Sequence, residues 1–522
     1  MKRCASFLSC LLGSSFFLGA SCAAPGPNVS PVVAPAAKVK SEVENVLLPL
    51  PNSPLVAMRV VFRHGSAADT PGKEGLAALT AAMIAEGGAA DHTYAQLLDA
   101  LYPMAGSISY HVEKDITVFW GMVHRDRAAA YGDLLSQQLT APRFAEDDFA
   151  RNKQAAVDFV SKNLRGNDDE ELGKEALAAL MYRDHPYGHP SAGTVSGIES
   201  ITLQDVRDFY RAYYTRQNAI MGLAGGFPAA LAQRFTVALE AGLPAAGRTL
   251  APLPKRTIAP AGMRVLVVDK KAPATAISMG HPIDVSRNDD DFYPLFVAAS
   301  YLGEHRTFNG VLMQNMRGKR GLNYGDYAYV ENFVQDGWST FPLPNIGRRQ
   351  QHFAIWIRPV ASQNALFAMR QALFETERLY REGIPQAGFA ATVAFLRRYS
   401  QLWTQDISRR LGYAIDARIY GKDIIEELAA RLPVMTKDDV DQALRRHIDV
   451  AKIYVAVVSD AGEAFAQTLL SGEPSPIVYD TAGTPGDILA EDLLIERYAL
   501  PAGATMTQVV PVDEMFDGTV AD

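Results

Sequence analysis

Apolar residues recur along this chain with two different spacings, and each spacing predicts one kind of element. Alternation predicts strands at 57–63, 107–113 and 115–123, and an apolar run predicts a further strand at 219–224. Helical spacing predicts helices at 76–86, 94–102, 127–139, 146–164, 170–183 and 203–214. Antiparallel strands bracketed by several helices indicate an α+β sandwich.

The second half of the chain repeats features of the first. The segment Ile-Thr-Leu-Gln-Asp-Val at 201–206 recurs 234 positions later as Met-Thr-Lys-Asp-Asp-Val at 435–440, and a helix and an apolar strand follow each copy. We therefore expect two homologous α+β domains in tandem, each an antiparallel sheet flanked by helices. Two unrelated α+β domains are the alternative.

The predicted organisation has six parts. They are a signal peptide at 1–22, a Pro/Ala-rich tether at 23–44, an N-terminal domain at 45–246, a Pro-rich linker at 247–262, a C-terminal domain at 263–472 and a C-terminal extension at 473–522 that packs back on the body.

The start of the chain predicts export. Lys2 and Arg3 precede an apolar stretch at 7–20, and small residues precede Cys22, as in a secretory signal. All three cysteines fall in this leader, so no internal disulfide is expected. The sequence before Cys22 resembles a bacterial lipoprotein box, although its Leu stands one place too early. Lipidation of Cys22 and simple cleavage both remain open, which predicts a periplasmic protein or a membrane-anchored lipoprotein of a bacterial envelope.

Composition and charge narrow the function classes. The 522 residues are 48% hydrophobic and 21% charged, which is ordinary for a globular protein. The formal charge of -8 gives no reason to expect a nucleic-acid partner. A Gly-x-Ser-x-Gly elbow, a Walker loop and a dinucleotide fingerprint are all missing from the positions where their chemistry would require them.

The Ala/Leu-rich helix predicted at 76–86 carries the most informative pattern. It is opened by Gly75-Leu76-Ala77, ends at Gly87, and follows a strand that ends with Phe62 and Gly65. This order resembles the opening of the insulinase/pitrilysin family of zinc metallopeptidases, so we expect two insulinase-type domains. In that family the helix bears His-x-x-Glu-His directly after Gly-Leu-Ala. The residues in those three positions here are Ala78, Ala81 and Ala82.

Alanine cannot replace the family's catalytic side chains. Two His at i and i+4 lie on one helical face and can share a Zn²⁺, while the Glu between them takes a proton from metal-bound water. The resemblance also implies a third ligand, a Glu, from a later helix, expected here at 149–164, whose middle contains no Glu. The family's zinc is thus expected to lack its ligands, and we predict no catalytic residue and no cofactor.

Other histidines do not offer a replacement site. His64, His92, His111 and His124 are scattered over separate segments, and His185 and His189 flank Pro186 and Gly188 in a predicted turn. A zinc site needs at least three convergent ligands, so we interpret the single histidines as surface or hydrogen-bonded residues and the His185/His189 pair as part of a loop. The acidic run 168–171 is interpreted as the start of a helix.

A segment of the second half resembles the family's substrate-holding region. It reads Leu-Met-Gln-Asn-Met-Arg-Gly-Lys-Arg-Gly-Leu-Asn-Tyr at 312–324. By resemblance, Arg317 and Tyr324 would reach into the chamber and hold the substrate backbone, because both can donate hydrogen bonds to a peptide carbonyl. The alternative is a surface turn with a solvated Arg and a strand Tyr.

Together these features predict a non-catalytic, peptide-binding subunit. Some bacterial family members divide the zinc motif and the Arg/Tyr pair between two chains, and this chain has only the second set. Its expected partners are a homologous chain with the zinc motif, or a second copy of itself, together with extended peptides and, through a lipidated N-terminus, the membrane. One alternative is an envelope peptide-binding or assembly factor that works without a peptidase, and another is an active metalloendopeptidase with unrecognised ligands.

Overall fold

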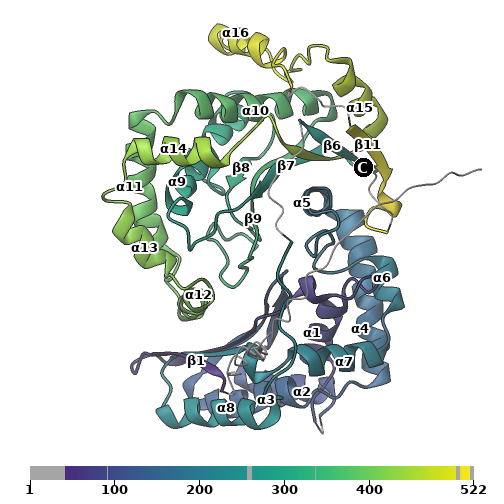
Figure 1. The fold of residues 1–522 in the computed structure, drawn as a ribbon, viewed down its shortest axis with the longest axis vertical. Coiled ribbons are helices and arrows are strands. Elements are labelled where there is room, and N and C mark those ends of the chain that lie inside the picture. Colours follow the sequence, from purple (N-terminus) through teal and green to yellow (C-terminus); the bar gives the residue numbers. More distant parts are fainter. Residues whose placement is uncertain (1–41, 91, 255–261, 336, 501–505, 518–522) are drawn as a thin grey trace, which may run out of the picture. The chain divides into compact units, whose positions relative to one another are not determined.

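A computed structural model describes residues 42–90, 92–254, 262–335, 337–500 and 506–517 (Figure 1). The predicted signal peptide 1–22, with Cys22, and most of the tether 23–44 lie outside these residues, as does much of the linker. Among the helices that are described, none combines the length and apolar character needed to cross a bilayer.

The first half contains a five-stranded sheet. Its order is β1 (Glu44–Pro49), β5 (Ala219–Gly225), β2 (Leu55–Phe62), β4 (Thr117–His124) and β3 (Ser109–Val112). β1 runs parallel to β5, and the other neighbours are antiparallel. β1 and β3 are therefore the two edges of this sheet.

The second half contains a six-stranded sheet of the same design. Its order is β11 (Met506–Pro511), β6 (Arg264–Asp269), β10 (Tyr454–Ser459), β7 (Thr275–Ile283), β9 (Gln351–Val360) and β8 (Asp326–Tyr329). β6 runs parallel to β10, and β7, β9 and β8 follow in antiparallel order. β11, from the C-terminal extension, adds a parallel strand beside β6.

Matching registers confirm that the two domains are a tandem repeat. Glu44 pairs with Ile220 in the first sheet, and Arg264 pairs with Tyr454 in the second, so the central partners are again 234 positions apart. The repeated Thr-x-x-Asp segments form equivalent capping boxes, in which Thr202 begins α7 (Leu203–Tyr213) and Thr436 begins α14 (Lys437–His447). The predicted α+β fold is therefore correct in both halves.

Helices cover one face of each sheet and form its main core. In the first half these are α1 (Leu76–Glu86), α2 (Tyr94–Leu101), α3 (Ala128–Thr140), α7 and α8 (Ala229–Gly242), with α4 (Glu146–Asp158) and α6 (Val195–Ser200) beside α1. In the second half they are α9 (Phe292–Gly303), α10 (Ala365–Glu382), α11 (Gln386–Leu402), α13 (Ile424–Arg431), α14 and α15 (Gly462–Ser471), with α16 (Gly486–Ile495) against α10.

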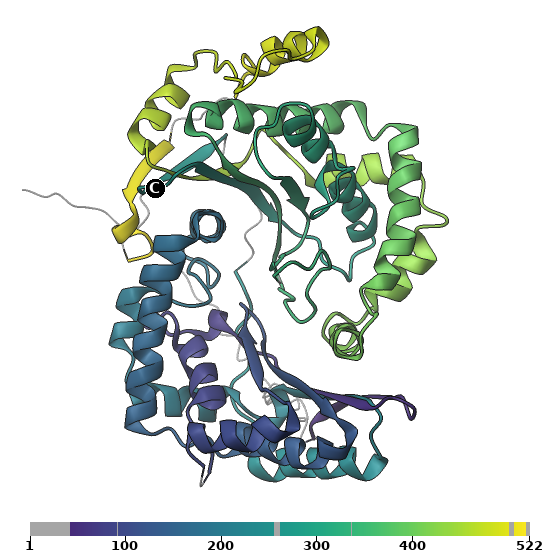
Figure 2. The same ribbon diagram turned by 180° about the vertical axis from the view of Figure 1, so that it is seen from behind.

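The other face of each sheet is covered by a helix from the opposite half. α5 (Asp169–Met181) packs on β7 and β10 of the second sheet, and α12 (Ile407–Tyr420) packs on β2 and β5 of the first (Figures 1 and 2). Leu172, Ala176 and Leu177 of α5 and Leu411 and Ile415 of α12 are buried in these contacts. The two halves thus exchange their inner helices.

Most predicted element bounds are close to the observed ones. The helix predicted at 76–86 matches α1 in both bounds. The helix predicted at 146–164 needs a correction, because α4 ends at Asp158 and the chain continues as a π-helix at Phe159–Asn167. The predicted packing of the C-terminal extension against the body is observed in β11.

Candidate functional site

The helix α1 is held rigidly at its first turn. Gly75 begins it with φ 109°, a conformation that suits glycine, and the half-buried Asp69 carboxylate accepts hydrogen bonds from the N–H groups of Gly75 (2.8 Å) and Ala77 (2.7 Å). Burial raises the pKa of Asp69 to about 7, although both hydrogen bonds oppose this shift. Ala and Leu then continue the helix with high propensity until Gly87.

A cavity of about 540 Å³ opens beside α1. Two of the three motif positions, Ala78 and Ala82, line it, whereas Ala81 is fully buried in the domain core. The other walls come from β3, α4, the π-helix and α5. The cavity therefore occupies the place to which a His at either lining position would point.

The residues around this cavity do not form a zinc site. Methyl groups stand at both motif positions that line the cavity. The helix expected to supply the third ligand contributes Asn152, Ala155 and Ala156 from α4 and Phe159 from the π-helix. Across the described ranges, His, Cys, Asp and Glu side chains form no group of three or more that is arranged to hold a metal ion. The donor set that tetrahedral zinc requires is thus not assembled here.

β3 supplies the strand along this cavity. Tyr110, His111 and Val112 line it, and β4 is the single neighbour of β3 in the sheet. The other edge of β3 has backbone N–H and C=O groups that no strand of the described chain pairs. Such an edge can bind an extended peptide as an added strand.

Glu113 is an ionised carboxylate in the wall of this cavity, and Arg348 balances its charge. Its Oε2 accepts a hydrogen bond from Arg348 Nη2 at 3.0 Å, and its Oε1 lies 3.1 Å from His111 Nε2. Burial opposes ionisation of Glu113, but the charge of Arg348 and the contact with His111 outweigh it and lower its pKa to about 2. Glu113 therefore stays ionised and cannot serve as a general acid near neutral pH.

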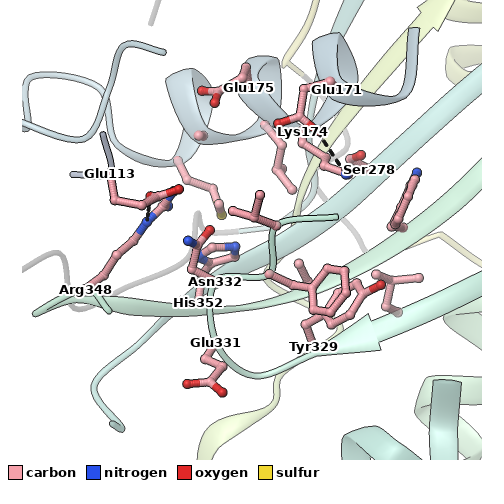
Figure 3. Close-up of a pocket in the computed structure, with 18 residues that line it drawn as sticks. Glu113, Glu171, Lys174, Glu175, Ser278, Tyr329, Glu331, Asn332, Arg348 and His352 are labelled. Carbon is pink, nitrogen blue, oxygen red and sulfur yellow. Dashed lines mark hydrogen bonds and ion pairs between the residues drawn. The ribbon is translucent and has the colours of Figure 1, made fainter. Parts of the chain in front are cut away.

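A smaller cavity of about 80 Å³ lies beside the first, between α5 and the second sheet (Figure 3). The two share Glu113, Glu171, Glu175 and Val334 in their walls. Lys174 Nζ donates to Glu171 Oε2 at 3.0 Å and lies 3.7 Å from the ring centroid of Trp356. This ammonium is therefore held by a carboxylate and an aromatic face together.

Glu175 has a different environment from its neighbour Glu171. It lines both cavities and has no hydrogen bond or ion pair with any residue that the structure describes. Burial raises its pKa, and Lys114 only partly opposes this shift. Glu175 is thus an acidic group that faces both cavities without a hydrogen-bonded or ion-pair partner among the described residues.

Comparison with known proteins agrees with this architecture. Residues 46–195 match the family model described as Insulinase (Peptidase family M16), and residues 200–343 match the model described as Peptidase M16 inactive domain. The chain belongs to the insulinase family. Both matches together span more than half of it.

Two bacterial proteins are similar to this chain at 22% and 24% identity. The chain is 22% identical to an uncharacterized zinc protease of Streptomyces coelicolor, over 66% of this chain and 72% of that one. It is 24% identical to an uncharacterized zinc protease of Mycobacterium bovis, over 70% and 79% of the two chains. Its fold is similar to a crystal structure of a peptidase M16 inactive domain from Pseudomonas fluorescens, with TM-score 0.70, 20% identity and coverage of 80% and 95%.

Arg317 and Tyr324 lie together but outside the walls of both cavities. The Arg317 guanidinium carbon is 5.5 Å from the ring centroid of Tyr324 and 5.0 Å from that of Phe308. Tyr324 is 75% exposed. The structure brings the pair together at the surface, and its role in holding substrate stays a prediction.

Several residues of the site were not predicted from the sequence. Lys174, Glu175, Arg348 and Trp356 come from distant segments, and only the exchange of α5 brings them into one place. A partial signal existed in the acidic run 168–171. Asp168 caps α5 as expected, but Glu171 faces the cavity and Glu170 binds Arg358.

Proposed function

We propose that this insulinase-family homologue is exported and binds peptides without hydrolysing them, as the partner of a homologous chain that carries the zinc motif. The observation that carries the proposal is the cavity of about 540 Å³ at the motif helix, with Ala78 and Ala82 in its wall. A chain that keeps the binding volume but has methyl groups at the ligand positions suits binding better than hydrolysis.

The cavity has the features that an extended peptide requires. The unpaired edge of β3 would supply backbone hydrogen bonds, and alternate side chains would then enter the cavity. Its walls combine apolar groups, such as Leu79 and Phe159, with the carboxylates of Glu86 and Glu175. We therefore expect peptides of mixed apolar and basic composition to bind better than acidic ones.

Peptide binding is tested by filling the cavity. Ala82→Trp places a large ring in the binding volume, and the matched control is Ala129→Trp on the exposed side of α3. Fluorescence anisotropy of a labelled, extended peptide should show at least a tenfold weaker Kd for the first variant and an unchanged Kd for the second. Equal binding by wild type and Ala82→Trp would refute the cavity as the binding site.

Metal content tests the absence of catalysis. We expect the purified chain to hold far less than one zinc per molecule and to cleave no peptide. The triple variant Ala78→His, Ala81→Glu, Ala82→His should bind zinc only weakly, because α4 and the π-helix after it still lack the Glu that is the family's third zinc ligand. Stoichiometric zinc together with chelator-sensitive cleavage by the wild-type chain alone would instead support the alternative of an active metallopeptidase.

The partner is tested by affinity purification from the envelope fraction. Recovery of a homologous chain with His-x-x-Glu-His, and of zinc with it, is the expected result. Recovery of peptides without such a chain would favour the alternative of an envelope peptide-binding or assembly factor. A chain recovered from the cytosol would contradict the predicted export.

A further inference from the structure

The two sheets differ at one edge, and the repeat shows what is missing. β1 lies on β5 in the same register as β6 on β10, because Glu44 pairs with Ile220 and Arg264 with Tyr454. The outer edge of β6 is paired along its whole length with β11, from Arg264–Met506 to Asp269–Pro511. The outer edge of β1 has no such strand within the described part of the chain.

Burial of equivalent residues differs accordingly. Leu47 of β1 and Val267 of β6 lie 220 positions apart and hold the same place in the two sheets. Leu47 is 44% exposed, whereas Val267 is fully buried. Asn45 is exposed as well, whereas its equivalent Val265 is buried. The apolar strand β1 therefore remains open to solvent at a place that is closed in the second domain.

β11 shows what kind of strand closes such an edge. Val509 packs against the main core of the second domain, and Val510 against the core under α5, so that two consecutive apolar residues cover the two faces of the sheet. On β1 the equivalent faces carry Leu47 on one side and Val46 with Leu48 on the other. An added strand with two consecutive apolar residues would contact both faces in the same manner.

The edge of β1 lacks the features that usually prevent pairing. Exposed edges in natural sheets carry lysines, bulges or inward charges. β1 contains no lysine, its register with β5 is unbroken, and its single charge, Glu44, is paired with Arg63 at 2.6 Å. Pro49 stands only at the end of the strand. The edge is thus apolar, regular and neutral.

We propose that the outer edge of β1 is a docking site for an extended, uncharged segment of a partner protein, which lies parallel to β1 in the register that β11 takes on β6. A second copy of this chain fits less well. Two β1 strands related by a twofold axis would meet antiparallel, and β11 of each copy already pairs with β6. The site is independent of the cavity, because β1 and β3 are opposite edges of the sheet.

Hydrogen exchange with a strand peptide tests the proposal on the full chain. The probe is a synthetic peptide with the sequence of residues 506–512, Met-Thr-Gln-Val-Val-Pro-Val, whose side chains carry no charge. We expect it to slow exchange at 44–49 at least fivefold and to leave 109–112 unchanged. No slowing at 44–49, or slowing at β3 instead, would overturn the proposal.

A matched pair of substitutions distinguishes a peptide that pairs with the edge of β1 from one that binds nonspecifically to any exposed leucine. Leu47→Lys adds the charge that protected edges carry, and Leu98→Lys makes the same change on α2, where the leucine is 48% exposed. The peptide Kd should weaken at least tenfold in the first variant and stay within twofold in the second. Equal affinity of Leu47→Lys and wild type would overturn the proposal.

Two further outcomes would assign the edge to another occupant. If exchange at 44–49 is already slow without peptide, and becomes fast in a chain that begins at residue 42, then the chain's own N-terminal segment covers the edge. If it is slow only at high protein concentration, a second copy does. Either result would overturn the assignment to a partner protein.

Discussion

The inner faces of the two sheets carry the same tryptophan but a different cation. Arg59 pairs across the sheet with Trp120, and the equivalent Ser278 pairs with Trp356. In the first sheet the cation over the ring is Arg59 itself, 5.4 Å from the centroid of Trp120. In the second it is Lys174 of α5, 3.7 Å from the centroid of Trp356.

This difference changes how each exchanged helix packs on its sheet. The Arg59 side chain fills the space under α12, where it donates to Asn345 Oδ1 at 2.6 Å and to Ser408 Oγ at 3.3 Å. The short Ser278 lines the cavity of about 80 Å³ under α5. One repeat therefore uses this position to fix a helix, and the other has a cavity there.

The largest effect should come from the buried carboxylate that holds α12. Asp416 accepts hydrogen bonds from the Asn345 backbone and side-chain amides and lies 3.4 Å from Arg287. Asp416→Ala leaves these groups buried without their acceptor and should cost about 3–5 kcal/mol in urea unfolding. Glu175→Ala on α5 removes an unpaired carboxylate and should change stability by less than about 1 kcal/mol. Equal losses would break the comparison.

Exchanging the residue under the helix should have the next largest effect. Arg59→Ser gives the first sheet the residue of the second, and it should destabilise by about 2–3 kcal/mol, because Asn345 and Ser408 lose a charged donor. The control Arg211→Ser removes an exposed ion pair with Asp208 and should cost less than about 0.5 kcal/mol. If Arg59→Ser costs no more stability than the control Arg211→Ser, then Arg59 is not what fixes α12.

A pH dependence should separate the two repeats. His64, two residues after the end of β2, is fully buried among aromatic rings, and the register that aligns Val61 with Gly280 places Ile283 at the equivalent position. Burial lowers the pKa of His64 from 6.5 to about 3. The unfolded chain therefore binds one more proton between these values, and stability falls as the pH drops below 6.5.

Reciprocal substitutions measure the contribution of His64 to the pH dependence of stability. Between pH 6.5 and pH 5, His64→Ile should lose about 1–2 kcal/mol less free energy of unfolding than the wild type. Ile283→His should introduce a similar loss into the second repeat. Melting temperatures across this range provide the measurement, and an unchanged slope in His64→Ile would contradict the assignment.

The smallest effect concerns the cation over Trp356. Lys174→Met keeps the length of the side chain but removes its charge, and we expect a loss of about 0.5–1 kcal/mol. Lys162→Met, at an exposed pair with Asp158, should lose less than about 0.5 kcal/mol. If the two variants are equally stable, the contact with the ring contributes nothing.

The sequence predicted what depends on local pattern. The bounds of α1 follow from its propensity and its flanking glycines, and the repeat was visible because Thr202 and Thr436 each begin a helix with a capping box. Ala78, Ala81 and Ala82 lie on α1 because the helix bounds are as predicted, and Ala78 and Ala82 line the cavity. Their interpretation as positions of the zinc motif stays a prediction.

The exchange of helices could not be predicted in this way. Periodicity shows that Leu172 and Leu411 face a core, but it does not say which sheet provides that core. The smaller cavity depends on this choice, since Lys174 and Glu175 approach Trp356 only when α5 crosses to the second sheet. The change from α-helix to π-helix at Phe159 likewise has no simple signal in the sequence.

The exchanged helices have a consequence for the independence of the two repeats. A solitary repeat would leave the inner layer of its sheet bare, because the helix that it carries is shaped for another sheet. Two such repeats cover each other's sheets, so each half depends on the other for the second face of its sheet. In the single chain the two equivalent positions differ, since Arg59 fills the space under α12 and Ser278 lines a cavity under α5.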